Sequence, residues 1–299
     1  MERSQMGKTA LNQLLSDIKD RTYPNRIINK RINSKQPSLR EQPSSREQPA
    51  PLKQPSPRER IISFAKEFDS ILEIGPFCNP LLTGSNVKYL DVKNKNELEI
   101  MAKEIKLTTT NAPHIDYISP FGDLSIVDEK FDAIISSHNI EHQPDLILHI
   151  QQVEQILKDK GSYLLLVPDK RYCFDHFIQE ATLIDVIAAY QERRKLHHPT
   201  SFMKQCAFAT HNDAVRHWKE DHFDPHYYSD MSDRIKSRLS QFDTANKEYV
   251  DCHAWQFTPE SFASIVSMLN SIGLTRLKVQ SIYETAQDTL EFGAVLTWH

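Results

Sequence analysis

The sequence predicts an α/β protein whose core is a doubly wound, mostly parallel sheet. Two short apolar runs, at 71–75 and 87–91, have the composition of strands that are buried on both faces, and each ends in a glycine or an acid. A strongly periodic helical segment at 145–158, which Gly161 is expected to stop, then precedes another apolar run at 163–169. Strands and helices that alternate in this way predict parallel pairing, because a parallel connection needs a crossover.

Composition narrows the classes of protein that fit. The 299 residues carry a net charge of −4, which disfavours non-specific binding to nucleic acid or to a membrane surface. No apolar stretch approaches the roughly 18 residues of a membrane span, and no apolar signal region is present. Four widely spaced cysteines without a CxxC pair predict reduced thiols. We therefore expect a cytoplasmic protein with no membrane insertion and no nucleic-acid partner.

The chain is expected to contain three regions. Residues 1–35 combine one apolar helical face, at 8–20, with a basic segment; this helix would dock on the domain, contact a protein partner or be the remnant of a fused neighbour. Residues 36–58 repeat REQPS as REQPA between prolines, so we interpret them as a disordered linker. Residues 59–299 are enough for one α/β domain.

Helix and strand signals follow a regular order through that domain. The expected strands are 71–75, 87–91, 115–118, 131–138, 163–169, 275–282 and 291–298. The expected helices are 58–68, 97–106, 145–158, 181–194, 231–242 and one that begins at Pro259 after the cap residue Thr258. Residues 173–256 are expected to form a helical insertion after the fifth strand, at the carboxyl edge of the sheet where an acceptor would bind.

Three segments of the chain carry a family resemblance. They are Glu73-Ile74-Gly75 at the end of the first strand, Asp91 at the end of the second, and FDAIISSHNIEH at 131–142. In this order they resemble motifs of the class I S-adenosylmethionine-dependent methyltransferases, well over about residues 60–175 and moderately over the last 45. The resemblance implies a Rossmann-like sheet of seven strands with a terminal antiparallel hairpin, and S-adenosyl-L-methionine as the cofactor.

A longer pattern narrows the resemblance and also shows one departure from it. ILEIGPFCNP, SSHNIEH and LLVPDKRYCFDHF together look like a bacterial subgroup often found beside polysaccharide and glycosyltransferase functions. The family's first motif has further glycines after Gly75, whereas the turn here is PFCNP at 76–80. The methionine end of the cofactor would therefore meet a stiffer and bulkier loop. We interpret this loop as a variant of the subgroup, and the alternative is a degenerate site.

The resemblance implies cofactor contacts at the ends of the first two strands. Asp91 would accept hydrogen bonds from both ribose hydroxyls, although it could also be a helix N-cap. Glu73 would face the cofactor through water or its amino group, and its alternative role is that of a surface carboxylate. Gly75, with no Cβ, would let the backbone turn sharply beside the ligand.

The adenine and methionine ends are assigned in the same way. Pro120 stands where the family has an adenine-binding acid, so Asp123 with the Leu124 backbone is the nearest substitute, against the alternative of a plain turn aspartate. The backbone of Ser137 and His138 would line the methionine moiety. The residues expected to bind the cofactor are Glu73, Gly75, Pro76, Asp91, Asp123, Leu124, Ser137 and His138.

Three residues are candidates for handling the proton of an acceptor hydroxyl. His142 could be a general base, because an imidazole titrates near neutral pH; the alternative is a histidine that caps or packs on the following helix. Asp169 and His176 follow the fifth strand and could polarise a sugar hydroxyl, and the alternative for both is a salt-bridged loop.

The insertion is rich in histidine and aromatic residues. Its histidines at 211, 217, 222 and 226 are separated by six, five and four residues, which matches no compact ligand pair of known type, so no metal is predicted. The aromatic residues at 217–218 and 227–228 are better suited to a pocket for a carbohydrate or polar ring.

The leading interpretation is a methyltransferase acting on an oxygen (or nitrogen) of a sugar, glycan or small polar metabolite. The alternative is a non-catalytic methyltransferase-like partner of a glycan-assembly enzyme, which the altered glycine motif and Pro120 support. A nicotinamide-binding domain is disfavoured because GxGxxG is missing. A nucleic-acid methyltransferase is disfavoured by the acidic balance and by the lack of an Asn-Pro-Pro-Tyr-type segment after the fourth strand.

Overall fold

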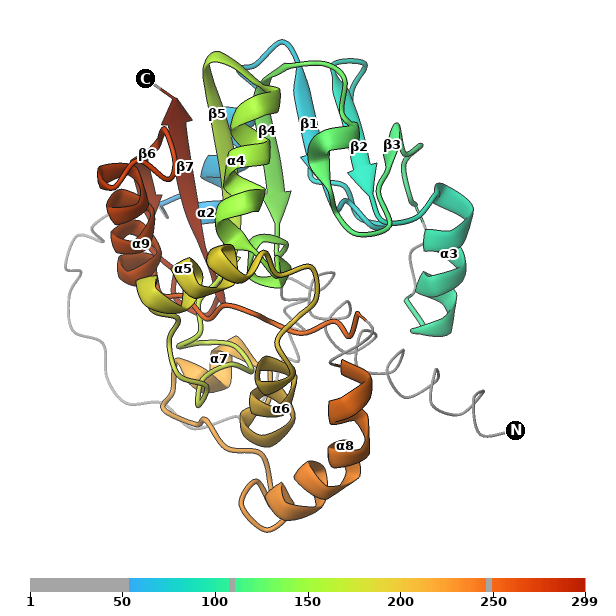
Figure 1. Ribbon diagram of the computed structural model, residues 1–299, viewed down its shortest axis with the longest axis vertical. Helices are drawn as coiled ribbons and strands as arrows, with labels where there is room; N and C mark the ends of the chain where they lie inside the picture. Colours follow the sequence, from blue (N-terminus) through green and yellow to red (C-terminus); the bar gives the residue numbers. More distant parts are fainter. Residues whose placement is uncertain (1–53, 108–110, 246–248, 299) are drawn as a thin grey trace, which may run out of the picture.

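The computed structural model describes residues 54–107, 111–245 and 249–298. A twisted sheet runs through this part of the chain with helices against both of its faces, and a group of further helices lies beyond one end of the strands (Figure 1). The expected helix at 8–20, the basic segment that follows it and most of the expected linker lie outside the described residues.

The strand order confirms the predicted fold class. The strands are β1 (Ile71–Ile74), β2 (Val87–Asp91), β3 (Tyr117–Ile118), β4 (Phe131–Ser137), β5 (Leu157–Pro168), β6 (Leu277–Tyr283) and β7 (Glu291–Trp298). They form one seven-stranded sheet in the order β3-β2-β1-β4-β5-β7-β6. Strands β1 to β5 pair in parallel, and β7 pairs antiparallel with both β5 and β6. The sheet is therefore doubly wound and mostly parallel, with a terminal antiparallel hairpin.

Burial on both faces explains why the strands are continuous apolar runs. Leu72 and Ile74 enter one apolar cluster and Ile71 enters the other, because successive side chains of a strand point to opposite faces. Leu165 and Leu164 of β5 divide in the same way. Helices α4 (Leu146–Ile156) and α9 (Pro259–Ser271) cover the first face, while α2 (Pro57–Ala65) and α3 (Lys95–Glu104) cover the second.

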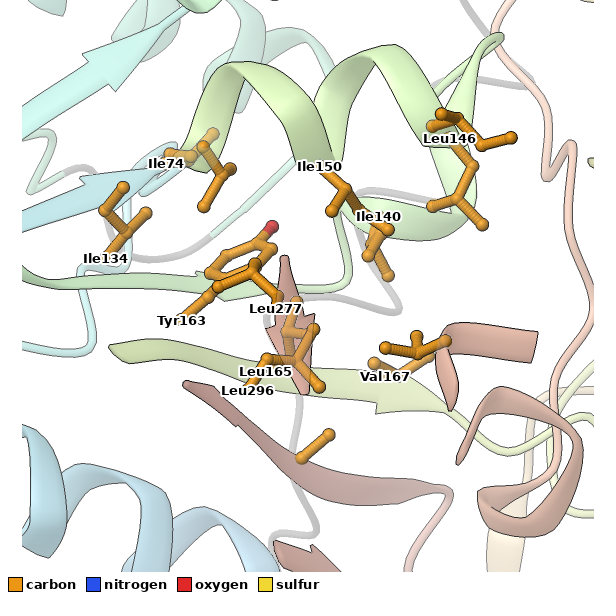
Figure 2. Packing of buried hydrophobic residues seen from close by; sticks show 14 of the residues in the cluster. Ile74, Ile134, Ile140, Leu146, Ile150, Tyr163, Leu165, Val167, Leu277 and Leu296 are labelled. Atoms are coloured by element: carbon orange, nitrogen blue, oxygen red, sulfur yellow. The ribbon is translucent and has the colours of Figure 1, made fainter. Parts of the chain in front are cut away.

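The first of these clusters joins α4 to most of the sheet. Figure 2 shows Ile150 of α4 on the same side of the sheet as Tyr163 and Leu165 of β5. As predicted, α9 begins after Thr258, whose hydroxyl accepts a hydrogen bond from the Ser261 N–H at 3.2 Å. The cap fixes where the helix starts and therefore which of its residues face the sheet.

The insertion after β5 is helical, as expected, but it has more helices than the sequence predicts. Helices α5 (Leu183–Glu192) and α8 (Met231–Ala245) match expected segments, while α6 (Pro199–Phe208) and the short α7 (Ala214–His217) were not predicted. The insertion leaves and rejoins the sheet at one point, where Asp169 and Phe257 form an isolated parallel bridge. Lys170 N donates to Phe257 O at 2.9 Å beside this bridge.

Several element boundaries differ from the expected ones by a few residues, and two of these differences change the interpretation of the sequence. Helix α2 begins at Pro57, so the last two residues of the expected linker are helical. Strand β5 begins at Leu157, because the chain turns from α4 directly into a pairing of Leu157 with Phe131. Gly161 is therefore a strand residue and not a helix stop; a Cβ there would lie 2.9 Å from the Lys158 carbonyl oxygen.

The four cysteines are free and buried, in agreement with the expected thiols. In the part of the chain that the structure describes, no helix is long and apolar enough to cross a membrane.

Candidate cofactor and acceptor cleft

A cavity of about 310 Å³ lies at the carboxyl edge of the parallel strands. Its wall includes residues that follow β1, β2, β3 and β4, together with Tyr249 and Asp251 from the end of the insertion. The volume is at the lower end of the roughly 300–1,000 Å³ that is typical of small-molecule sites. The edge of the sheet at which the sequence placed the cofactor therefore carries a cavity of suitable size.

The turn after β1 forms one side of the cavity. Gly75 lines it with a φ of 70°, and its N–H donates to the Leu90 carbonyl at 2.8 Å. The positive φ favours glycine at this position, and a Cβ there would lie 3.1 Å from Asn139 Nδ2, so the Asn139 side chain would have to shift by a few tenths of an ångström. In the altered glycine motif Phe77 also has a positive φ, of 48°, and lines the cavity.

Asp91 ends β2 on the adjacent part of the wall. Its Oδ2 accepts from Phe77 N at 2.9 Å and its Oδ1 accepts from Val92 N at 2.7 Å, while 7% of the residue is exposed. Asp91 therefore holds the loop after β1 and also presents a carboxylate to the cavity. A carboxylate oxygen can accept more than one hydrogen bond, which is what binding of the ribose hydroxyls would require.

Glu73 has a different position from the one expected. Its two oxygens accept from Leu81 N at 2.7 Å and Leu82 N at 3.1 Å, and the residue is buried away from the cavity wall. Burial raises the pKa of Glu73 to about 7, against the opposing effect of the two N–H donors. The carboxylate thus ties the far end of the 76–82 loop to β1 instead of facing a cofactor.

The wall of the cavity that follows β3, where the sequence analysis expects adenine, is apolar. Pro120, Phe121 and Gly122 line it, whereas Asp123 turns away. Asp123 caps the short helix η1 (Leu124–Ile126) by accepting from Ser125 N at 2.9 Å, and that hydrogen bond lowers its pKa. Asp123 instead lines a second cavity of about 520 Å³ that shares Phe121 and Gly122 with the first.

Ser137 and His138, at the end of β4, meet charged groups that the sequence did not single out. His138 has a φ of 49°, and its Nε2 donates to Glu291 Oε2 at 2.8 Å. Arg58 also donates to Glu291, and its Nη2 bonds Ser137 Oγ at 3.3 Å. Although burial alone would raise the pKa of Glu291, the charge of Arg58 and the hydrogen bond from His138 hold it down at about 2.

His142 lies on the cavity wall at the end nearest the insertion. It belongs to the short helix η2 (Ile140–His142), and its Nδ1 is 2.9 Å from Asp251 Oδ1. Tyr249 also donates to Asp251 Oδ1, at 2.7 Å. Asp251 and Tyr249 were missed in the sequence analysis, because 109 residues separate Asp251 from His142 and no local pattern marks it.

Asp169 and His176 do not reach the cavity. Asp169 is 0% exposed and accepts from Arg171 Nη2 and from Thr285 Oγ1, both at 2.6 Å. His176 Nδ1 is 2.8 Å from the Arg171 carbonyl, and its ring stacks on His222 with centroids 3.8 Å apart. The salt-bridged loop, which was the alternative for both residues, describes their contacts better than an acceptor site does.

The aromatic residues expected at an acceptor pocket pack on one another. Tyr172 stacks on Trp218 with centroids 4.0 Å apart, and Trp218 Nε1 donates to the Thr289 carbonyl at 2.9 Å. Tyr227 is buried and bonds the Phe208 carbonyl. These side chains pack within the insertion and against residues close to it. The end of the cavity nearest the insertion is lined instead by His142, Tyr249 and Asp251.

The strand order and the cavity at the carboxyl edge define a Rossmann-like fold of the class I methyltransferase type. Residues 81–165, less than half of the chain, match a family model described as a methyltransferase domain. Residues 81–165 therefore have the sequence of a methyltransferase domain, a type of domain whose cofactor is S-adenosylmethionine.

Several solved structures are similar to this chain at low sequence identity. A SAM dependent methyltransferase from Aquifex aeolicus is 12% identical with a TM-score of 0.38, covering 80% of this chain and 89% of that one. The CcbJ methyltransferase from Streptomyces caelestis is 9% identical with a TM-score of 0.42, covering 85% and 100%. An S-adenosylmethionine-dependent methyltransferase from Clostridium acetobutylicum is 10% identical with a TM-score of 0.40, covering 81% and 90%. No curated protein sequence matches the chain.

Proposed function

We propose that this chain transfers the methyl group of S-adenosylmethionine to an oxygen (or nitrogen) of a small polar acceptor of the sugar or glycan class. The observation that carries the proposal is the single cavity that runs from Gly75 and Asp91 to His142 and Asp251. It brings a nucleoside-sized space and a histidine–carboxylate pair into one site.

The residues of the cavity fit the cofactor. Asp91 would hold the ribose hydroxyls, the apolar wall of Pro120 and Phe121 would pack on adenine, and the space beside Gly75 and Asn139 would take the methionine end. When bound, S-adenosylmethionine supplies a methyl group that is already activated on its sulfonium. The protein then has to align an acceptor and accept its proton, and positioning accounts for much of the effect.

His142 and Asp251 are suited to accepting that proton. A carboxylate only accepts hydrogen bonds, so the 2.9 Å contact to Asp251 places the proton of a neutral imidazole on Nδ1 of His142. The lone pair of Nε2 is then the basic one. This is the residue pair to which we assign general base catalysis in an acceptor complex.

A polar acceptor is supported by the chemistry of this end of the cavity. Asn139, Gln143, Tyr249 and Asp251 contribute amide, phenol and carboxylate groups. Such groups bind hydroxyl-bearing ligands by hydrogen bonding, and Tyr249, which is 44% exposed, can also pack against a sugar ring. The glycan class itself rests on the subgroup resemblance of the sequence.

Calorimetric titration of S-adenosylmethionine and S-adenosylhomocysteine tests the cofactor site. We expect micromolar binding to the wild type that is lost in Asp91→Ala and weakened in the isosteric Asp91→Asn, which keeps the side-chain shape. Asp123→Asn is the matched control and should bind normally, because Asp123 faces the neighbouring cavity. Absence of binding to the wild type would contradict the proposal and favour the non-catalytic partner.

A further inference from the structure

Glu141, His142 and His253 bring three metal-binding groups to one buried place beside the cavity. One donor atom of each lies within 4.8 Å of the donor atoms of the other two. Nε2 of His142 and Nε2 of His253 are 3.7 and 3.9 Å from Glu141 Oε1. The first two residues follow β4, and His253 comes from the segment that returns from the insertion.

Glu141 is the least compensated of the three groups. The residue is 1% exposed, and in the described part of the chain neither of its carboxylate oxygens has a hydrogen-bond partner. Its backbone carbonyl accepts from Ala254 N at 2.8 Å, which holds the residue in place. A buried carboxylate without donors is unfavourable unless a positive charge lies against it.

The two imidazoles are oriented by carboxylates on their other side. His142 Nδ1 is 2.9 Å from Asp251 Oδ1, and His253 Nδ1 is 2.6 Å from Asp175 Oδ2. Asp251 and Asp175 each hold the ring proton on Nδ1 of the histidine that they contact. In both rings Nε2 is therefore the atom that would coordinate a metal, and it lies on the side of Glu141. Metal-binding histidines are usually held in this way by a carboxylate behind the ring.

We propose that Glu141, His142 and His253 bind one divalent transition-metal ion, such as Zn²⁺ or Mn²⁺. Two imidazole nitrogens and one carboxylate suit these ions, whereas Ca²⁺ and Mg²⁺ prefer sites built from oxygen. Ligands about 2.1 Å from a tetrahedral ion lie roughly 3.4 Å apart, so the two separations from Glu141 Oε1, 3.7 and 3.9 Å, need to shrink by only a few tenths of an ångström. The proposal stands independently of methyl transfer.

A second cluster of three histidines has a ring geometry that is poorly suited to binding a metal. His176, His217 and His222 also have donor atoms within 4.8 Å of one another. However, His176 and His222 are stacked at 3.8 Å with 14° between their planes, so their in-plane lone pairs point in parallel directions. In contrast, the rings of His142 and His253 are at 85° to one another. The stacked cluster therefore serves as the control.

The position of the site suggests its use. His142 and Asp251 line the cavity, so the ion would be held at the acceptor end. Three protein ligands leave coordination positions open on such ions. One open position would then hold an acceptor oxygen in place. Because Nε2 of His142 would be a metal ligand, the general-base role proposed above applies only to the metal-free protein.

Titration of the full chain with metal alone tests the site. After treatment with a chelator and dialysis, the wild type should bind one equivalent of Zn²⁺ or Mn²⁺ by calorimetry, and bound Zn²⁺ should raise the melting temperature. Mg²⁺ and Ca²⁺ at equal concentration should do neither. Glu141→Gln, which keeps the side-chain shape, and His253→Asn should each weaken Zn²⁺ binding at least tenfold, while His222→Gln should bind as the wild type does.

Two results would overturn the proposal. One is a wild type that binds no Zn²⁺ or Mn²⁺ at micromolar concentration, which would leave the two imidazoles alone as the neighbours of the Glu141 carboxylate. The other is equal loss of binding in Glu141→Gln and His222→Gln. Circular dichroism establishes that each variant is folded, and His253→Asn provides the test if Glu141→Gln is not. Titration with S-adenosylhomocysteine is a separate measurement, so failure of the metal site and failure of the proposed function remain distinguishable.

Discussion

Arg58 and Glu291, 233 residues apart in the chain, form a two-pronged ion pair with Nε–Oε1 at 2.7 Å and Nη2–Oε2 at 2.6 Å. The pair joins the first described helix to the last strand. His138, directly after β4, bonds the same carboxylate, so one buried glutamate connects three elements at the carboxyl edge of the sheet. The end of β4 is thereby fixed beside the cofactor cavity.

Loss of this carboxylate should destabilise the fold. Glu291→Ala leaves the Arg58 cation and His138 without their shared partner, and we expect the free energy of unfolding to fall by roughly 3 kcal/mol. Urea denaturation measures it. The control is Asp233→Ala, in an exposed ion pair with Lys236 that should contribute less than about 1 kcal/mol. Similar losses in the two variants would contradict the assigned role of Glu291.

Glu73 should give stability a distinct pH dependence. Its folded-state pKa of about 7 is above the ordinary glutamate value of 4.5, so the protonated form is favoured by folding. Its contribution is full below about pH 4.5 and is lost as the pH rises through 7. We expect Glu73→Gln to reduce the fall in unfolding free energy between pH 5 and pH 8, as measured by urea denaturation. An unchanged pH profile in the variant would argue against the raised pKa.

Gly75→Ala should weaken the cofactor site through two effects. The φ of 70° disfavours a side chain by about 1–2 kcal/mol, and the new Cβ would displace Asn139 from the cavity wall. We expect at least a tenfold loss of S-adenosylhomocysteine affinity. Gly273→Ala is the matched control, because Gly273 has a φ of 77° and nothing within 4 Å of its Cβ position. Gly273→Ala should lose similar stability and keep full affinity for S-adenosylhomocysteine. An equal loss of affinity in Gly273→Ala would contradict a specific role of Gly75 in the cofactor site.

Substitution of His142 and substitution of His176 should have clearly different effects on kcat once an acceptor is known. His142→Ala should lower kcat about a hundredfold or more with cofactor affinity intact, because the cavity loses the group that serves the acceptor oxygen. His176→Ala should leave kcat within a fewfold, since that ring stacks on His222 away from the cavity. Steady-state kinetics of both variants decide this, and equal rates would remove His142 from the mechanism.

Hydrophobic pattern predicted the strands and the fold class because both faces of the sheet are covered, so each strand had to be a run of apolar residues. Pattern failed at Gly161, where a glycine that resembles a helix stop is required by close backbone packing inside a strand. It also failed for α7, which has four residues and is too short for a helical period to be recognised.

The candidate site could be predicted only for residues that come directly or shortly after a strand. Gly75, Asp91 and His142 lie where parallel strands deliver their next residues, and all three line the cavity. Asp169 also follows a strand, but Arg171 and Thr285 use its carboxylate fully. Asp251 and His253 were not predicted, because only folding of the insertion brings them to residues more than a hundred positions earlier.

The bridge between Asp169 and Phe257 has a consequence for how such a chain can diversify. Because the segment between these residues starts and finishes at a single point of the sheet, its exchange or lengthening requires no change in the order of the strands. Such an exchange would replace Asp251, His253 and Asp175 together, while Gly75 and Asp91 stayed in place. In the proposed function, the residues that select the acceptor could therefore change during evolution without a change in the residues that bind the methyl donor.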